Sequence, residues 1–599
     1  MKKLYKKLSV SPIVNILLFL ISAAGIAVFS LLLAIGNGQM NMFYDYFRYP
    51  LTFFLNALPV FLLQGLFWCI FGRLWIAFLL TAAVVLTASA GNFFKLIIRY
   101  EPFLFSDISF IGAALGVSKD YSLSLNSRFI LMIVSVFLGT ALLAVLARRK
   151  SKSIYRIIAA ALILFSCFPL WRFVYSSDRI YTGKKIVQRD YDREMYKTAS
   201  KGFIYPFLYS IKDVMKSPPD GYDEKTVAEL LSSYNDSSIP DDKRINIIAV
   251  QLEAFTDLRQ LGIKGISDET YAYYDKLKEE SLSGLLMVNV NGGATIDTEQ
   301  CFLTGDYAFS RIVKSVPSFV WYLRGQGYRT VGGHPYYSFY GRQITNPLLG
   351  FEDYRFCENY SAYPDIEQLL PSKNYSDCFF FDSIFEQYKK LVSAGENVFS
   401  FNVTMQGHGP YSKEEYLFGS NWFKDGTSSD TTAHILNNYL GGLADTQHYL
   451  SQFIDALRDE EHPAVVVLYG DHKPWLGDNS SVAEEFGIPY NSSSEEGIRN
   501  FYSTEYVIWA NNKAREIYPD RFSGTGPTIS TCYLLALVFD RLDWHCYGFG
   551  NYLLDRLDVL NVITSKGIFY ENGVLTESLS TEGKKALQTA EYIQYYRQR

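Results

Sequence analysis

Five short apolar runs after residue 242 are each followed by residue types that could do chemistry. Carboxylates or imidazoles follow four of these runs, and a threonine preceded by two glycines follows the other. Two carboxylates and a neutral imidazole around one position suit a divalent cation, and a hydroxyl bound to such a cation loses proton affinity and becomes a nucleophile. The candidate residues are, in chain order, Glu253, Thr295, His334, His408, Asp471 and His472.

Each candidate also has an ordinary structural explanation when it is taken alone. A single glutamate such as Glu253 is most often a surface or capping residue, and Asp471-His472 or Gly292-Gly293 could each belong to a plain turn. Their repetition after successive apolar runs favours the chemical interpretation. The cation would be Mn²⁺, Mg²⁺ or Zn²⁺, and an oxygen-rich set of ligands favours the first two.

The apolar runs themselves have the composition of buried strands. Helical periods separate them, at residues 316–324, 383–393 and 437–457. Continuous apolar strands that alternate with helices predict an α/β domain with a largely parallel sheet buried on both faces. Ligands of such sheets collect at the carboxyl ends of the strands, so we expect the candidate residues to share one edge. The predicted strands are residues 245–250, 285–290, 330–332, 398–403, 464–469 and 506–509.

Several common catalytic signatures are missing from the sequence. It contains no G-x-x-x-x-G-K-[ST], G-x-G-x-x-G, G-x-S-x-G or H-E-x-x-H segment. Nucleotide hydrolysis, dinucleotide binding, serine hydrolase and zinc protease chemistries are therefore disfavoured. The surviving class is metal-assisted transfer at phosphorus or sulfur.

Charge and hydropathy divide the chain into two parts. Residues 1–174 hold 16 Lys and Arg against 4 Asp and Glu, a net of +12, whereas residues 175–599 hold 40 against 57, a net of −17. The first part predicts a membrane domain with about five transmembrane helices, and neither part points to a nucleic-acid partner. Four uncharged runs are long enough to cross a bilayer and a shorter fifth is flanked by arginines, at residues 13–36, 51–72, 74–92, 129–147 and 157–171.

The placement of Lys and Arg predicts the orientation of this membrane domain. Four lysines within the first seven residues and the basic stretch 148–156 would stay on the cytoplasmic side. Five crossings then place everything after about Ser176 outside the cell. Residues 101–107 would form an interfacial or re-entrant segment rather than a sixth crossing.

We therefore expect four consecutive regions. Residues 1–175 form the membrane domain, residues 176–242 a helical connector, residues 243–565 an extracellular catalytic domain, and residues 566–599 a C-terminal tail packed on that domain.

Three segments of the sequence resemble the lipoteichoic acid synthases and related phosphoglycerol transferases. They are Gln251-Leu252-Glu253-Ala254-Phe255, Gly293-Ala294-Thr295-Ile296-Asp297-Thr298-Glu299 with the following Leu303-Thr304-Gly305, and Tyr469-Gly470-Asp471-His472-Lys473-Pro474. Members of that family have a multi-pass α-helical membrane domain and an extracellular α/β sulfatase-like domain of the alkaline phosphatase type. The resemblance implies the same fold class and a location in the cell membrane for this chain.

The resemblance also implies roles for individual residues. Glu253, Thr295, Asp471 and His472 would bind one divalent cation, Mn²⁺ or alternatively Mg²⁺, and Thr295 would be the nucleophile. The substrate-binding residues would be His334, Tyr340, Arg342 and His408. Tyr340 stands where the best-known members have a tryptophan, which leaves the identity of the acceptor open.

The implied function is transfer of glycerol phosphate from the membrane lipid phosphatidylglycerol to a glycolipid or a growing cell-surface polymer. A covalent glycerophospho-threonine intermediate would form on Thr295. Three alternatives remain open: a phosphoglycerol transferase that decorates another cell-surface glycan, a metal-dependent phosphodiesterase or sulfatase-type hydrolase, and a non-catalytic surface receptor that keeps the fold. The C/S-x-P-x-R pattern of true sulfatases is missing near Thr295 and Cys301.

Overall fold

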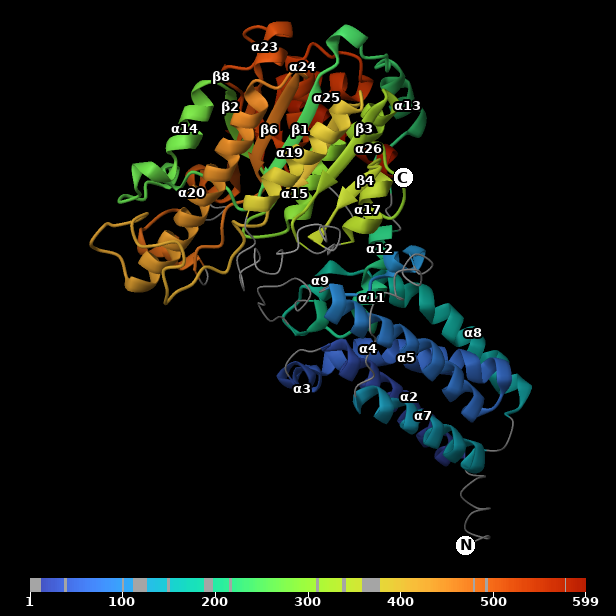
Figure 1. Cartoon of the computed structure of the whole chain (residues 1–599). Helices are drawn as coiled ribbons and strands as arrows, with labels where there is room; N and C mark the ends of the chain where they lie inside the picture. The colour runs from blue at the N-terminus through green and yellow to red at the C-terminus, as the bar shows by residue number, and fades with distance from the viewer. Residues whose placement is uncertain are drawn as a thin grey trace. The chain divides into compact units, whose positions relative to one another are not determined.

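The chain forms two compact units, which we call the helical unit, Met1–Ser217, and the α/β unit, Pro218–Arg599 (Figure 1). Both belong to a computed structural model of the full sequence. The model describes residues 12–36, 40–99, 102–110, 127–147, 151–187, 198–214, 218–308, 312–336, 341–357, 377–477, 480–490, 494–576 and 578–599.

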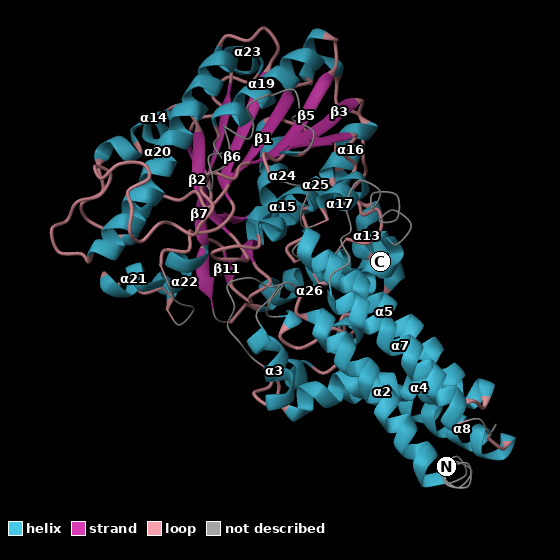
Figure 2. Cartoon of the chain, turned by 60° about the horizontal axis from the view of Figure 1, so that its bottom comes forward, coloured by secondary structure: helices cyan, strands magenta, loops and turns pink. Residues whose placement is uncertain are grey.

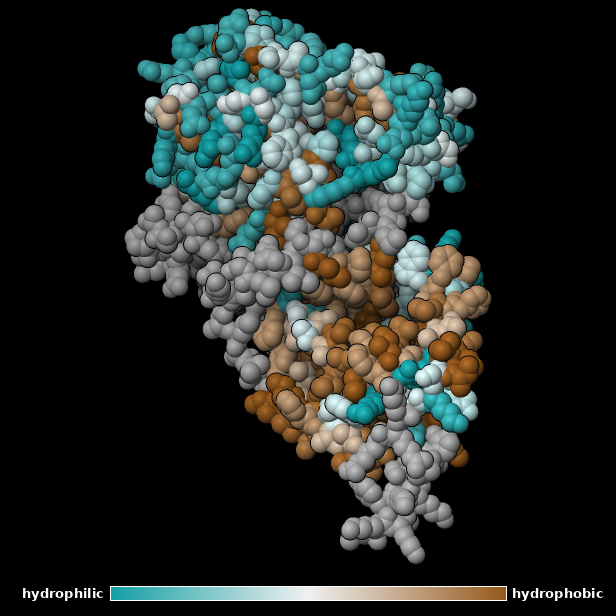
Figure 3. Space-filling view, turned by 90° about the vertical axis from the view of Figure 1, so that its right-hand side faces the viewer, coloured by the Kyte–Doolittle hydropathy of each residue, from teal (hydrophilic) through white to brown (hydrophobic). Residues whose placement is uncertain are grey.

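Five helices in the described part of the helical unit are long and apolar enough to cross a membrane. Many of their large apolar side chains face outward; the Phe165 side chain, for example, is 83% exposed. Brown, hydrophobic surface accordingly covers much of these helices in Figure 3. Such a surface requires an apolar environment, so the chain is a membrane protein. The helices are α2 (Pro12–Ala34), α4 (Pro50–Phe71), α5 (Leu74–Arg99), α7 (Ser127–Leu146) and α8 (Ser153–Leu170), the last continued by a π-helical turn (Trp171–Tyr175).

Shorter elements complete the helical unit. The segment predicted to be interfacial contains a 3₁₀ helix, η1, in which Asp107 forms an ion pair with Lys95 at 3.0 Å. Its length of 6 residues is far too short to span a bilayer. The short elements are α3 (Met40–Arg48), η1 (Phe105–Phe110), α9 (Asp178–Tyr181), α11 (Ile204–Tyr209) and α12 (Ile211–Val214).

A buried asparagine joins two distant parts of the helical unit. The Asn56 amide nitrogen donates to the carbonyls of Thr52 and Lys201, both at 2.8 Å, and its Oδ1 accepts from the Tyr205 backbone N–H at 3.1 Å. Gly202 fits against this side chain, because a Cβ atom there would lie 2.4 Å from Asn56 Oδ1. Helix α4 therefore holds the 201–205 segment through side-chain hydrogen bonds.

We predict that Asn56→Ala lowers the stability of the detergent-solubilised protein by about 1–3 kcal/mol, because it leaves buried backbone groups of Lys201 and Tyr205 without partners. Thermal melting followed by fluorescence measures the effect. Thr140→Ala is the matched control, since the Thr140 hydroxyl donates to the Val136 carbonyl within its own helix. Equal melting temperatures for the two variants would contradict the joining role of Asn56.

The α/β unit is built on a nine-stranded sheet of order β4-β3-β5-β1-β6-β7-β2-β8, with β9 paired to β2. Strand β7 is antiparallel to both of its neighbours, and the other pairings are parallel. The largely parallel sheet predicted from the apolar runs is confirmed. The strands are β1 (Asn246–Leu252), β2 (Leu282–Met287), β3 (Tyr328–Gly333), β4 (Asp353–Arg355), β5 (Asn397–Val403), β6 (Ala464–Gly470), β7 (Ser503–Ala510), β8 (Gly524–Thr525) and β9 (Ile529–Ser530).

Helices cover both faces of this sheet (Figure 2). Successive strand residues point to opposite faces, so Ile247 packs into one core and Ile248 into the other. The first core includes residues of α15 (Thr295–Thr304), α16 (Phe319–Gly325), α24 (Thr531–Arg541), α25 (Gly548–Val559) and α26 (Thr581–Gln598). The second core includes residues of α14 (Ala272–Glu279), α19 (Cys378–Ser393) and α20 (Asp430–Arg458).

The remaining elements of the α/β unit surround these layers. The helices are α13 (Glu224–Ser232), α17 (Arg342–Leu349), α21 (Ser481–Glu485), α22 (Glu495–Tyr502) and α23 (Asn512–Ile517). Three 3₁₀ helices are η4 (Asp241–Lys243), η5 (Leu258–Leu261) and η6 (Asp268–Thr270). A second, antiparallel sheet contains β10 (Leu560–Ile563), β11 (Phe569–Glu571) and β12 (Val574–Thr576).

Candidate active site

The carboxyl ends of three strands bring the central candidates together. Glu253 directly follows β1, Asp471 and His472 follow the neighbouring β6, and Thr295 begins helix α15 after β2. One ligand atom each from Glu253, Asp471 and His472 lies within 4.8 Å of the others, and all three residues are buried. The sequence separates Glu253 from Asp471 by more than two hundred positions, and the parallel pairing of β1 with β6 removes that separation.

The Thr295 hydroxyl lies against this cluster. Its Oγ1 donates to Glu253 Oε2 at 3.1 Å and lies 3.4 Å from His472 Nε2. His472 Nε2 is also 3.3 Å from Asp471 Oδ2 and 3.6 Å from Glu253 Oε1. Four potential ligand groups therefore converge on one small volume.

A backbone carbonyl holds one ring nitrogen of His472. Nδ1 lies 2.9 Å from the Lys473 carbonyl oxygen, which accepts hydrogen bonds and cannot donate them. Nδ1 therefore carries a proton, which leaves Nε2 as the ring nitrogen that would bind a cation. Metal-binding histidines typically donate from one ring nitrogen to a carbonyl or carboxylate and bind the metal through the other.

Two buried carboxylates so close together are electrostatically unfavourable without a cation. The pKa of Glu253 is raised well above its ordinary value, first by burial and then by the neighbouring charge of Asp471. Asp471 Oδ1 accepts from the backbone N–H groups of Ala254 and His472, at 2.7 and 2.8 Å. Asp471 Oδ2 is buried and has no hydrogen-bond partner among the described residues. The donor set therefore fits a divalent cation, which would satisfy that oxygen and neutralise both charges.

Two glycines let the loops around Glu253 approach closely. A Cβ atom on Gly407 would lie 2.0 Å from the Glu253 carbonyl oxygen, and one on Gly470 would lie 2.0 Å from the Phe255 carbonyl oxygen. The Glu253 backbone N–H donates to Thr404 Oγ1 at 3.0 Å. The chain after β5 and the end of β6 thus hold the Glu253 turn, a support that the sequence patterns did not identify.

The structure distinguishes the two threonines of helix α15. Thr298 is buried, and its hydroxyl donates to the Asp471 backbone carbonyl at 2.8 Å. Thr295 lies in the first turn of the helix after Ala294, whose φ of 65° is left-handed. Gln251 Nε2 donates to the Thr295 carbonyl at 3.2 Å, and Tyr469 in turn donates to Gln251 Oε1 at 2.9 Å. Thr298 therefore supports the Asp471 loop, while the Thr295 hydroxyl faces the cluster.

The predicted substrate-binding residues have different environments. His334 is buried, and its Nδ1 donates to the Val403 carbonyl at 2.9 Å. Burial, followed by the charge of Arg342, holds the pKa of His334 well below its ordinary value, so this imidazole is neutral. Arg342 is also buried and forms an ion pair with Glu299, whereas His408 is exposed. Tyr340 lies outside the described residues.

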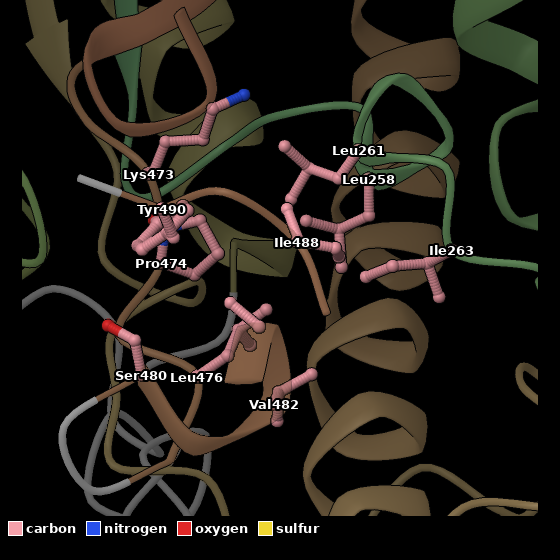
Figure 4. A pocket seen from close by; sticks show the side chains of 11 residues that line it. Leu258, Leu261, Ile263, Lys473, Pro474, Leu476, Ser480, Val482, Ile488 and Tyr490 are labelled. Carbon is pink, nitrogen blue, oxygen red and sulfur yellow. The ribbon is translucent and has the colours of Figure 1, made fainter. Parts of the chain in front are cut away.

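Lys473, the residue after the Asp471-His472 pair, does not join the cluster. Its Nζ donates to Thr256 Oγ1 at 2.8 Å, and burial lowers its pKa to about 8. Lys473 is one of the residues that line the pocket in Figure 4, together with Leu258, Leu261 and Ile488. Lys473 therefore stabilises the loop after β1 rather than facing the candidate ligands.

The fold and the cluster define an α/β domain with a candidate metal centre beside a threonine. Residues 245–536 match the family model named Sulfatase. Most of the α/β unit is therefore similar to the sulfatase family, and the predicted fold class, apolar helices followed by a sulfatase-like α/β domain, is confirmed.

Two curated proteins of Rhizobium meliloti (strain 1021) are similar to this chain. A protein named for cyclic beta-1,2-glucan modification is 24% identical over 382 residues, which are 60% of this chain and 56% of that protein. The capsular polysaccharide biosynthesis protein RkpI is 29% identical over 257 residues, which are 41% of this chain and 43% of RkpI. The matched stretches thus span only about half the length of each relative.

Solved structures with some likeness to the chain include two transferases. The Streptococcus pyogenes phosphoglycerol transferase GacH, in complex with sn-glycerol-1-phosphate, has a TM-score of 0.47 and 19% identity, covering 63% of this chain and 94% of GacH. The lipoteichoic acid synthase LtaP from Listeria monocytogenes has a TM-score of 0.45 and 17% identity, covering 62% of this chain and 97% of LtaP.

We predict that Glu253→Gln and Asp471→Asn abolish the thermal stabilisation that Mn²⁺ gives to the parent protein, because each removes a charged ligand. Without metal, both variants should melt at or above the temperature of the parent, since each relieves the repulsion between the two carboxylates. Thermal melting with EDTA and with added Mn²⁺ measures both effects.

Glu505→Gln is the matched control for this measurement. Glu505 is a buried carboxylate of the same unit, but it accepts from Gln260 Nε2 and lies outside the cluster. Its variant should keep the Mn²⁺ response. Full stabilisation by Mn²⁺ in both cluster variants would contradict the metal centre.

Proposed function

We propose that the chain transfers glycerol phosphate from phosphatidylglycerol to a hydroxyl group of a cell-surface acceptor, with Thr295 as the nucleophile. The observation that carries this proposal is the Thr295 hydroxyl at the start of α15, in contact with the buried cluster of Glu253, Asp471 and His472. The apolar helices of the same chain support a lipid as the donor, because they would keep the enzyme at the bilayer surface.

Glu253, Asp471, His472 and Thr295 would hold one divalent cation, for which we propose Mn²⁺, with Mg²⁺ as the alternative. When bound, the cation would lower the proton affinity of the Thr295 hydroxyl and offset the negative charge of the phosphate. Carboxylate and hydroxyl oxygens outnumber the single imidazole, which favours these two metals over Zn²⁺.

The proposed reaction consists of two displacements at phosphorus. Thr295 Oγ1 forms a bond to the lipid phosphorus while the bond from phosphorus to the diacylglycerol oxygen breaks. The proton of Thr295 already faces Glu253 Oε2, and diacylglycerol leaves after its oxygen gains a proton. An acceptor hydroxyl then displaces Thr295 Oγ1, which regains a proton. Arg342 would orient the phosphate oxygens, His334 would accept a hydrogen bond from a substrate hydroxyl through Nε2, and the exposed His408 would exchange protons with the leaving or attacking hydroxyl.

The acceptor could be a growing polymer or another glycan. The names of the two Rhizobium meliloti relatives refer to glucan modification and capsular polysaccharide biosynthesis. These names support a second candidate function, in which the chain decorates a cell-surface glycan with glycerol phosphate instead of extending a polymer.

One experiment separates these functions and the hydrolytic alternative. Detergent-solubilised protein is incubated with Mn²⁺ and phosphatidylglycerol labelled in the headgroup, with and without an added β-glucan or glycolipid. Label on the added acceptor, together with free diacylglycerol, supports the transferase. Glycerol phosphate released to water in every reaction would instead identify a hydrolase, and an unchanged lipid would contradict both.

We predict that Thr295→Ala abolishes diacylglycerol release, whereas Thr295→Ser keeps part of it, because only the serine retains a hydroxyl. Rapid quenching of the parent enzyme followed by peptide mass spectrometry should place a glycerophosphate adduct on Thr295. Thr298→Ala is the control and should cost much less activity, since the Thr298 hydroxyl supports the Asp471 carbonyl. An adduct on Thr298, or normal turnover by Thr295→Ala, would contradict the assignment.

We further propose that the five apolar helices are transmembrane segments and that the α/β unit lies outside the cell. The basic clusters within residues 1–7 and 148–156 support a cytoplasmic location for both of those segments. Phosphatidylglycerol of the outer leaflet would then be the accessible donor.

The expected topology is tested with Asp430→Cys and Lys150→Cys in intact cells. A membrane-impermeant maleimide should label position 430 above the background of the parent chain and leave position 150 unlabelled until the cells are permeabilised. Protection of position 430 would contradict the extracellular location of the α/β unit without affecting the assignment of the metal centre.

A further inference from the structure

Helix α15 carries Thr295 and Glu299, whose side chains lie one turn apart. Thr295 begins the helix, and Glu299, four residues later, lies on the same side of it. The Glu299 carboxylate forms a two-pronged ion pair with Arg342, the first residue of α17. Arg342 Nε donates to Glu299 Oε2 at 3.1 Å, and Arg342 Nη2 donates to Glu299 Oε1.

From this geometry we infer that Glu299 is a positioning residue, which holds the Arg342 guanidinium in one orientation for the phosphate group at Thr295. The inference rests on the proposed function and adds a residue that does not itself touch the substrate. Through α15, the orientation of Arg342 is tied to the same rigid element that places Thr295.

The contacts of the pair explain how such positioning works. A bidentate contact fixes the plane of the guanidinium as well as its position. Arg342 contacts Glu299 through Nε and Nη2, so its Nη1 atom lies on the opposite edge of the guanidinium. Both side chains are only 3% exposed, so water does not compete for this arrangement.

Arg342 also lies near a predicted substrate-binding residue. Its positive charge adds to the effect of burial in lowering the pKa of His334. Arg342 is therefore close to His334 as well as to Glu299.

A second buried ion pair, near the other end of α15, serves as a control for a purely supporting role. Asp306 lies just past the other end of α15, and its Oδ1 accepts from Arg597 Nε at 3.3 Å. The two side chains are 3% and 7% exposed, which is close to the burial of the Glu299–Arg342 pair. Asp306→Asn therefore controls for the loss of a buried ion pair as such.

The test measures binding of sn-glycerol 1-phosphate to the Mn²⁺-loaded, full-length protein by calorimetry. The variants are Glu299→Gln, Arg342→Gln, their double mutant and Asp306→Asn. We expect Glu299→Gln to weaken binding at least tenfold in the parent and less than twofold in the Arg342→Gln background, because Glu299 acts through Arg342. Asp306→Asn should bind within twofold of the parent.

Two outcomes would overturn the inference: parent-like binding by Glu299→Gln, or additive losses in the double mutant. Glu299→Asp keeps the charge with a shorter reach and replaces Glu299→Gln if that variant does not fold; it should lose affinity in the same background-dependent way. A parent protein that binds glycerol phosphate but releases no diacylglycerol from phosphatidylglycerol would contradict the proposed function alone. The binding pattern of the variants would still decide the role of Glu299.

Discussion

The repulsion between Glu253 and Asp471 is the constraint on which the site depends. Two buried carboxylates in one cluster raise the free energy of the folded α/β unit unless a cation or a proton neutralises them. Their positions are set by the parallel pairing of β1 with β6, so neither carboxylate can withdraw without disturbing the centre of the sheet. The sheet therefore stores an unfavourable charge arrangement that a divalent cation would turn into a favourable one.

The rest of the site is consistent with this charge arrangement. A divalent cation would balance the two carboxylates, and Arg342 is already balanced by Glu299. A bound phosphodiester would then meet directed N–H donors and the positive end of the α15 dipole rather than an excess of full positive charges. Alignment, more than net charge, is what such a site would supply, and phosphoryl transfer depends strongly on alignment.

The sequence predicted the long central strands β1, β5 and β6 well, because buried parallel strands are nearly continuous apolar runs. The short strands β4, β8 and β9 were not predicted, because two or three residues carry too little pattern. The convergence of Glu253, Thr295, Asp471 and His472 followed from the rule that strand ends share an edge. Periodicity and motifs could not identify the partner of Arg342, because Glu299 is 43 residues away and belongs to another helix. Motif position alone favoured Thr295 over Thr298, since the directions of two hydroxyls in one helical turn depend on tertiary contacts such as that of Thr298 with the Asp471 carbonyl.

Helix α15 connects these observations physically. Its first residue faces the cluster, its Thr298 holds the Asp471 loop, and its Glu299 holds Arg342. Residues Phe302 and Leu303, further along the same helix, pack into the core beneath the sheet. A rigid helix anchored in the core cannot shift one of these groups without shifting the others. The proposed nucleophile, the Asp471 loop and Arg342 are thereby placed by a single element, which explains how residues from distant parts of the sequence keep a common geometry.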